Sequence, residues 1–264
     1  MSYTHVVKTM CYPLSQTAYR ITIAIPKKQA PREGYPVLYV LDGNAYGGLF
    51  ENIVTMQSRR TEKTGVHLSV VVSIGYEHEE VFNSLRVYDF TPRSEVVNLP
   101  EHPSGKPWPT SGGAERFLEV LKEVKEIVRQ MLDVNDKQQL IFGHSLGGLF
   151  LVHTLVREPQ LFSHYYICSP SLWWNQEQVL QEALHISQLE CAIFIAVEQE
   201  SKHRMYENAW SLFRHLEALP LQSVQFQTSP GENHMSIVPT TISQALRFLM
   251  NTKSFSPEQQ KIEE

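Results

Sequence analysis

A Gly-x-Ser-x-Gly motif at positions 143–147, centred on Ser145, constrains the fold of this chain more than any other stretch. An apolar run, 139–142, precedes the motif, and a helix-like run, 149–155, follows it. This succession is typical of a nucleophile elbow, where a sharp strand-to-helix turn exposes a serine hydroxyl at the end of a sheet. We expect glycine at 143 and 147 because side chains there would collide with the neighbouring strand and helix. The alternative is an ordinary glycine-rich turn.

Apolar runs of strand length recur along the chain and alternate with helix-like stretches. Strands are expected at 18–25, 36–41, 66–75, 139–142, 165–168, 191–197 and 223–228. Helices are expected at 49–57, 117–131, 149–155, from 176, at 205–219 and up to 249. Buried strands that alternate with helices predict an α/β protein with a mostly parallel central sheet and helices on both faces. With the elbow, this pattern favours the α/β-hydrolase fold.

The sequence predicts a single domain over residues 1–250, because neither repeats nor an interdomain linker interrupt the alternation. Two insertions are expected within it, a proline-rich loop at 76–113 and a smaller one at 169–190. A loop as long as 76–113 is usually functional or mobile, although it could be a plain surface excursion. The polar tail 251–264 is expected to fray.

Composition and charge exclude several classes of protein. The net charge is −5 and no dense run of Lys and Arg occurs, so neither nucleic acid nor an anionic membrane surface is an expected partner. No apolar run approaches the roughly 18 residues of a membrane span, and the start lacks a signal-peptide pattern. The three cysteines, Cys11, Cys168 and Cys191, lack zinc-site spacing. We expect reduced, buried thiols in a cytoplasmic protein that needs no metal or other cofactor.

The serine needs a general base within hydrogen-bonding reach, because a free hydroxyl is a weak nucleophile. In α/β-hydrolases the histidine follows the last strand of the sheet. His234 is the histidine expected in a turn between the last strand and the last helix. We therefore assign His234 as the base, the alternative being a surface loop histidine. His144, next to the serine, is expected to pack or to orient other groups.

The acid that orients the base must be a glutamate, because no aspartate occurs after Asp136. Its expected position is just after the run 191–197, where both Glu198 and Glu200 stand. We favour Glu200, three residues beyond the run. A third possibility is a Ser-His dyad, in which a backbone carbonyl fixes the tautomer of His234. Either glutamate could also be a solvated loop charge.

Two backbone amides are expected to bind the oxyanion. One belongs to Leu146, at the start of the helix after the serine. The other is assigned to Gly43, in the loop after the run 36–41, where glycine would let the backbone approach a substrate closely. The alternative for Asp42-Gly43 is a simple turn.

Beyond the elbow, several motifs make the chain resemble the esterase branch of the α/β-hydrolases, from about residue 5 to residue 250. These motifs are Leu41-Asp42-Gly43-Asn44-Ala45, Ser73-Ile74-Gly75-Tyr76, Arg86-x-Tyr88-Asp89-Phe90-Thr91-Pro92, Ser169-Pro170-Ser171-Leu172-Trp173-Trp174-Asn175 and Glu232-Asn233-His234. In particular, the chain is similar to the siderophore trilactone esterases, which hydrolyse enterobactin and bacillibactin. The resemblance implies a serine esterase with Ser145 and His234 as nucleophile and base, working as a Ser-His-Glu triad or as a Ser-His dyad.

The resemblance also implies a substrate. Arg86 would lie near it and suit an anionic catecholate, and Trp173 and Trp174 would offer aromatic faces. We expect a small-molecule ester, in particular a catecholate siderophore lactone; a ferric siderophore would carry its iron as part of the substrate. If Arg86 were structural, it would pair with Asp89 or another carboxylate.

Two further functions remain open at the level of sequence. The first is a short-chain esterase or a thioesterase of the S-formylglutathione hydrolase kind, although those relatives carry Leu-Ser-Gly-Leu where this chain has Leu41-Asp42-Gly43-Asn44. The second is an inactive hydrolase fold that serves as a binding module, against which the intact Ser145 and His234 argue.

Overall fold

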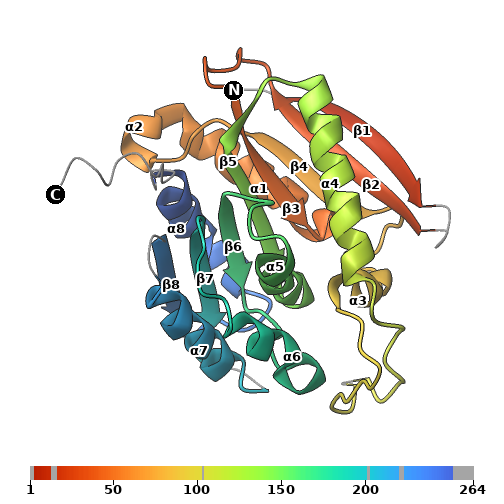
Figure 1. Cartoon of the computed structure of the whole chain (residues 1–264). Coiled ribbons are helices and arrows are strands. Elements are labelled where there is room, and N and C mark those ends of the chain that lie inside the picture. The colour runs from red at the N-terminus through yellow and green to blue at the C-terminus, as the bar shows by residue number, and fades with distance from the viewer. Residues whose placement is uncertain (1–2, 13–16, 103, 201–202, 220–222, 252–264) are drawn as a thin grey trace.

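One eight-stranded sheet forms the centre of the computed structural model, which describes residues 3–12, 17–102, 104–200, 203–219 and 223–251 (Figure 1). The strand order is β1-β2-β4-β3-β5-β6-β7-β8. The strands are β1 (Tyr3–Tyr12), β2 (Thr17–Pro26), β3 (Tyr35–Leu41), β4 (Val70–Tyr76), β5 (Val134–His144), β6 (His164–Cys168), β7 (Ala192–Glu198) and β8 (Ser223–Ser229). The β1–β2 and β2–β4 pairs are antiparallel and all the others are parallel, which confirms the predicted mostly parallel sheet.

Helices cover both faces of this sheet, as the alternation of runs predicts (Figure 1). One face carries α1 (Gly43–Gln57) and α8 (Ile237–Asn251). The other carries α3 (Leu85–Phe90), α4 (Ala114–Met131), α5 (Leu146–Arg157), α6 (Trp174–Ala183) and α7 (Met205–Glu217). Two short helical turns, η1 (Ser58–Arg60) and α2 (Thr61–Thr64), follow α1. This arrangement is an α/β-hydrolase fold.

The central strands are continuous apolar runs because both of their faces are covered. Every residue of β3 and of β7 is buried. Successive side chains point to opposite faces. In β7, Ile193, Ile195 and Val197 enter the core under α4 to α7, whereas Ala192, Phe194 and Ala196 face α1 and α8.

Several features of the fold differ from the expectations; for example, β4 begins at Val70 rather than at 66, and α1 begins at Gly43 rather than at 49. Strand β1 was not predicted; it is an edge strand paired with β2, and most of its side chains are exposed or half-buried, so its hydrophobic alternation is weak. The edge position also leaves Cys11 exposed, whereas Cys168 and Cys191 are buried as expected. The expected loop 76–113 contains α3. Of the tail expected to fray, residues 252–264 lie outside the described part.

No helix in the described ranges combines the length and the hydropathy that crossing a bilayer requires.

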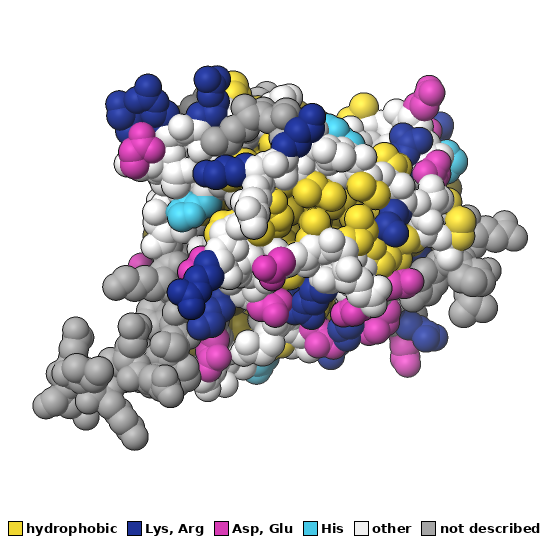
Figure 2. All heavy atoms as spheres, turned by 90° about the horizontal axis from the view of Figure 1, so that it is seen from above, with side chains coloured by type: hydrophobic (Ala, Val, Ile, Leu, Met, Phe, Trp, Pro, Cys, Tyr) yellow, Lys and Arg dark blue, Asp and Glu magenta, His cyan; other side chains and the backbone are white. Residues whose placement is uncertain are grey.

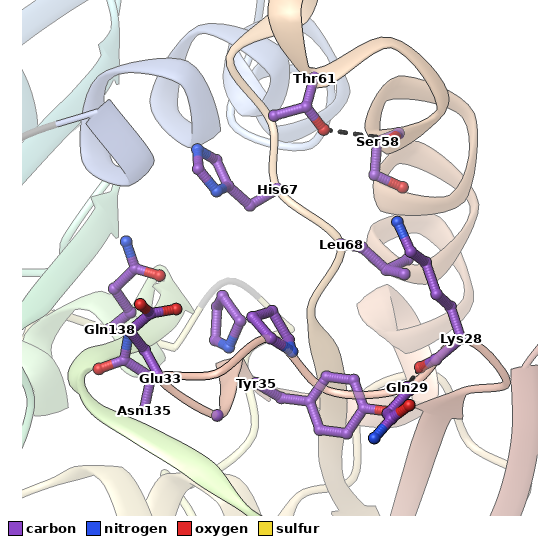
Figure 3. Close-up of a pocket in the computed structure, with 13 residues that line it drawn as sticks. Lys28, Gln29, Glu33, Tyr35, Ser58, Thr61, His67, Leu68, Asn135 and Gln138 are labelled. Carbon is purple, nitrogen blue, oxygen red and sulfur yellow. Dashed lines mark hydrogen bonds between the residues drawn. The ribbon is translucent and has the colours of Figure 1, made fainter.

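The two ends of the parallel sheet differ in what they expose. Figure 2 looks onto the end where the parallel strands begin, and hydrophobic side chains gather in the middle of this face among charged ones. A cavity of about 420 Å³ lies at this end, with Tyr35, His67 and Asn135 among its lining residues (Figure 3). None of the predicted site residues lines it. Ligands of open α/β sheets bind outside the carboxyl ends of the strands, so the active site is expected at the opposite end.

Candidate active site

Ser145 lies between β5 and α5 in a strained backbone conformation, with φ 60° and ψ −117°. Two backbone hydrogen bonds join this turn to the end of β6 and to the turn that follows β6. The Ser145 amide donates to the Cys168 carbonyl at 3.0 Å, and the Ser171 amide donates to the Ser145 carbonyl at 3.0 Å. Strain of this kind persists only where the surroundings fix it, and it clusters at functional sites. The turn has the geometry of a nucleophile elbow.

Close packing explains two glycines of the elbow. A Cβ on Gly143 would lie 2.4 Å from the Gly147 carbonyl oxygen, as the expected collision requires. At Gly147 the expectation is wrong, because the nearest atom, Asp42 Oδ2, would lie 3.6 Å away, an ordinary contact. The second demanding position is Gly148, where a Cβ would lie 2.9 Å from Pro170 Cα. The elbow therefore packs tightly against the turn that follows β6.

His234 lies in the turn between β8 and α8, where the sequence places the base. Its Nδ1 lies 3.0 Å from Glu198 Oε1, so Nδ1–H donates to the carboxylate and Nε2 is left as the basic nitrogen. Glu198 is 2% exposed and His234 is 34% exposed, so the carboxylate is buried behind a ring that reaches the surface.

The preference for Glu200 over Glu198 is corrected by this contact. Strand β7 extends one residue beyond the predicted run and ends at Glu198, which pairs in register with Ser229 of β8. Since side chains alternate along a strand, Glu198 shares the face of Phe194 and Ala196, which α8 covers. His234 lies in the turn that leads into α8, which begins at Ile237. Glu200 lies beyond the strand end and is exposed.

The Glu198 carboxylate keeps its charge despite burial. Burial alone would raise its pKa, but hydrogen bonds from His234 and from the Ser169 hydroxyl outweigh it, and the pKa lies below its usual value. A negative charge at Glu198 favours the Nδ1–H tautomer of His234.

The His144 ring packs against the His234 ring, and the two ring centroids lie 4.5 Å apart. Its Nε2 lies 2.8 Å from the His234 carbonyl oxygen, so Nε2 carries the proton and donates it. The Tyr46 hydroxyl then donates to Nδ1 of His144 at 3.0 Å. Burial, followed by the nearby His234 and Arg86, lowers the pKa of His144 to about 3. A neutral His144 thus holds the backbone of His234 in place.

The expected oxyanion donors both lie at helix starts. Gly43 is the first residue of α1 and Leu146 the first of α5, so neither amide has an intrahelical acceptor. Glycine at 43 is required by packing on β4, because a Cβ would lie 2.8 Å from Ile74 N. Asn44 belongs to a motif noted in the sequence, but no role was assigned to it; its side chain exchanges hydrogen bonds of 3.1 and 2.8 Å with the backbone of Tyr76, the last β4 residue. It fixes the start of α1.

The predicted substrate contact of Arg86 is corrected, because its side chain is only 12% exposed and does not line the active-site cavity. Its Nε and Nη2 donate to the two carboxylate oxygens of Asp42, both at 2.8 Å. Nη2 also donates to the His144 carbonyl at 3.3 Å. Asp89, the other carboxylate considered, pairs with Arg116 instead. Arg86 therefore joins the loop before α1 to the elbow.

Asp42→Asn is expected to lower the free energy of unfolding by about 3 kcal/mol, because it leaves the buried Arg86 guanidinium without its counter-charge. Asp42 has φ 50°, and asparagine tolerates this left-handed region as well as aspartate does, so the change isolates the charge. Urea denaturation measures the effect. A loss below about 1 kcal/mol would show that the pair is dispensable for the fold.

A cavity of about 400 Å³ opens at the carboxyl ends of the strands and includes Ser145 and His234. Its aromatic wall consists of Trp108, from the 76–113 segment, and Trp173, whose ring centroids are 6.0 Å apart. Trp108 was not singled out from the sequence. Trp174, which was predicted to contact the substrate together with Trp173, is 1% exposed and does not line the cavity. It packs behind Trp108, and the two ring centroids lie 5.2 Å apart.

Ser145 is hydrogen-bonded to a second serine in this structure. Its Oγ lies 3.2 Å from Ser171 Oγ. Among the described residues, Ser145 Oγ makes no hydrogen bond with His234, whose Nδ1 contacts Glu198. Contacts between nucleophile and base are often loose in ligand-free enzymes and tighten with substrate.

The fold and the strained serine turn define the class as α/β-hydrolase. A family model described as Putative esterase matches residues 15–228. The ferri-bacillibactin esterase BesA of Bacillus subtilis is 39% identical over 257 residues, which cover 93% of this chain and 89% of that protein. The chain therefore belongs to this esterase family.

Two further relatives extend the comparison. The crystal structure of the BES protein from Bacillus cereus superposes with a TM-score of 0.86 at 37% identity, covering 97% of this chain and 98% of that one. An apo-salmochelin esterase of Escherichia coli is 33% identical over 186 residues, which cover 69% of this chain and 56% of that protein.

Proposed function

We propose that this protein is a serine hydrolase that cleaves the ester bonds of a catecholate siderophore trilactone, with Ser145, His234 and Glu198 as its catalytic triad. The observation that carries the proposal is the hydrogen bond from His234 to the buried Glu198 carboxylate, beside a serine in a strained elbow. Membership of the esterase family, and the siderophore esterases among its relatives, support the substrate class.

In the proposed mechanism Ser145 Oγ rotates away from Ser171 and attacks the ester carbonyl while His234 Nε2 takes its proton. Glu198 accepts from Nδ1–H and stabilises the imidazolium that forms. The amides of Gly43 and Leu146 bind the oxyanion of the tetrahedral intermediate. His234 then protonates the leaving alcohol. A water molecule, deprotonated by His234, releases the acid and restores Ser145.

The described lining of the cavity favours recognition of aromatic rings over charge pairing. Trp108 and Trp173 offer ring faces, whereas no Lys or Arg is among the described residues that line the cavity. Glu101 and Glu200 add carboxylates at its wall. We therefore propose that a catechol ring of the substrate stacks on these tryptophans. This contact takes the place of the ion pair between a catecholate and Arg86 that the sequence suggested. Any iron would enter as part of the substrate.

The experiment that tests the function follows an iron-free catecholate trilactone and its ferric complex by chromatography, with p-nitrophenyl acetate as a simple ester. We expect stepwise opening of the trilactone to linear trimer and shorter esters. Brisk cleavage of p-nitrophenyl acetate without turnover of either trilactone would contradict the substrate and leave a general esterase. Absence of turnover on all three would contradict the hydrolase itself.

Trp108→Ala is expected to raise KM for the trilactone about tenfold, which corresponds to about 1.4 kcal/mol, because one stacking face is lost. For p-nitrophenyl acetate, which is too small to span the wall, KM should change less than about twofold. Trp210→Ala is the matched control, since Trp210 is exposed on α7 and does not line the cavity. An equal rise in KM on both substrates would show a general disturbance of the loop.

A further inference from the structure

The turn Ser169-Pro170-Ser171, which follows β6, connects the acid to the nucleophile. We propose that Ser169 is a positioning residue of the reaction, whose hydroxyl fixes the Glu198 carboxylate in the orientation that holds His234. This inference rests on the proposed function. Ser169 does not line the cavity, and its hydroxyl reaches the reacting groups through Glu198.

The geometry shares the Glu198 carboxylate between two donors. The Ser169 hydroxyl donates to Oε2, and Nδ1–H of His234 donates to Oε1 at 3.0 Å. Two donors on opposite oxygens leave the carboxylate one orientation in which both bonds form. Glu198 is 2% exposed, so a lost donor leaves one of its oxygens with less stabilisation than a solvated carboxylate has.

The backbone of the turn holds the hydroxyl in place. Ser169 is fully buried and has φ 42°, in the left-handed region that a side-chain residue rarely adopts. Its amide donates to the Ala196 carbonyl at 2.7 Å, which ties the turn to β7 two residues before Glu198. Pro170 packs against Gly148, where a Cβ would lie 2.9 Å from Pro170 Cα. The turn is therefore fixed between β7, which ends at Glu198, and α5, which follows Ser145.

Two titratable groups near Glu198, His144 and Cys168, carry no charge. His144 stays neutral because burial, then His234 and Arg86, lower its pKa to about 3. Burial likewise raises the pKa of the Cys168 thiol, near Glu198, to about 12. The Ser169 hydroxyl is one of the donors that hold the pKa of Glu198 below its usual value, so its loss raises the pKa of Glu198.

The test measures pH profiles of kcat and kcat/KM on p-nitrophenyl acetate for Ser169→Ala and Ser169→Gly. Glycine accepts φ 42° without strain, so this variant loses the hydroxyl while easing the backbone. We expect both to lower kcat about tenfold, to change KM less than about twofold, and to move the acid limb of kcat/KM to higher pH. Ser171→Ala removes the other hydroxyl of the turn, which contacts Ser145, and should leave the acid limb in place.

A double-mutant cycle separates positioning from a structural role. If Ser169 acts through Glu198, Ser169→Gly should have no further effect on kcat in a Glu198→Gln protein. A similar loss in both backgrounds, or a wild-type acid limb in both Ser169 variants, would overturn the inference while leaving the hydrolase intact. A wild-type protein without ester turnover would overturn the proposed function and this inference together.

Discussion

Ser145→Ala is expected to lower ester hydrolysis by roughly 10⁴-fold or more, because it removes the atom that forms the acyl-enzyme. The loss should appear in kcat on both p-nitrophenyl acetate and the trilactone. The fold should persist, because the substitution removes one side-chain hydrogen bond, the bond between Ser145 Oγ and Ser171 Oγ. Steady-state kinetics with circular dichroism as the folding control measures both.

Retention of more than about 1% of the wild-type rate in folded Ser145→Ala would contradict its assignment as nucleophile. Ser171→Ala is the informative comparison, because it removes a hydroxyl 3.2 Å from the same position. If Ser171→Ala lost as much activity as Ser145→Ala, the two serines would have to share the role.

Glu198→Gln is expected to lower kcat by about 10³- to 10⁴-fold. The neutral amide keeps the shape but removes the charge that favours the Nδ1–H tautomer of His234 and stabilises the imidazolium. Glu200→Gln is the matched control: Glu200 is exposed at the cavity wall, beyond the strand end, and we expect a change within about tenfold.

The pair of variants also tests the alternatives. A loss within about tenfold in both would favour a Ser-His dyad in which backbone groups orient the histidine. A large loss in Glu200→Gln alone would restore the glutamate favoured by sequence and contradict the contact of His234 with Glu198.

Local patterns carried enough information to place the elbow and the turn of His234. The Gly-x-Ser-x-Gly motif lies between an apolar strand and a helix, and order along the chain restricts the histidine to the turn before α8. The choice between Glu198 and Glu200 depended on where β7 ends, and strand ends are the least certain part of a sequence-based prediction. The signal was nevertheless present, because Glu198 continues the alternation of Phe194 and Ala196 toward the face of α8.

Long-range contacts explain the expectations that failed. The sequence around Arg86 does not indicate that Asp42, 44 positions away, accepts hydrogen bonds from both Nε and Nη2 of its guanidinium. Likewise, the adjacent Trp173 and Trp174 look equivalent in sequence, but packing against Trp108 exposes one to the cavity and buries the other. The weakly alternating β1 forms because β2 offers it an edge.

The most direct test of an activated Ser145 is mass spectrometric mapping of the protein after reaction with diisopropyl fluorophosphate. We expect one phosphoryl adduct per chain on the peptide that contains Ser145, formed together with the loss of esterase activity, and strongly slowed in His234→Ala. An adduct on another residue, or full loss of activity with Ser145 unmodified, would contradict the assignment of Ser145 as the nucleophile.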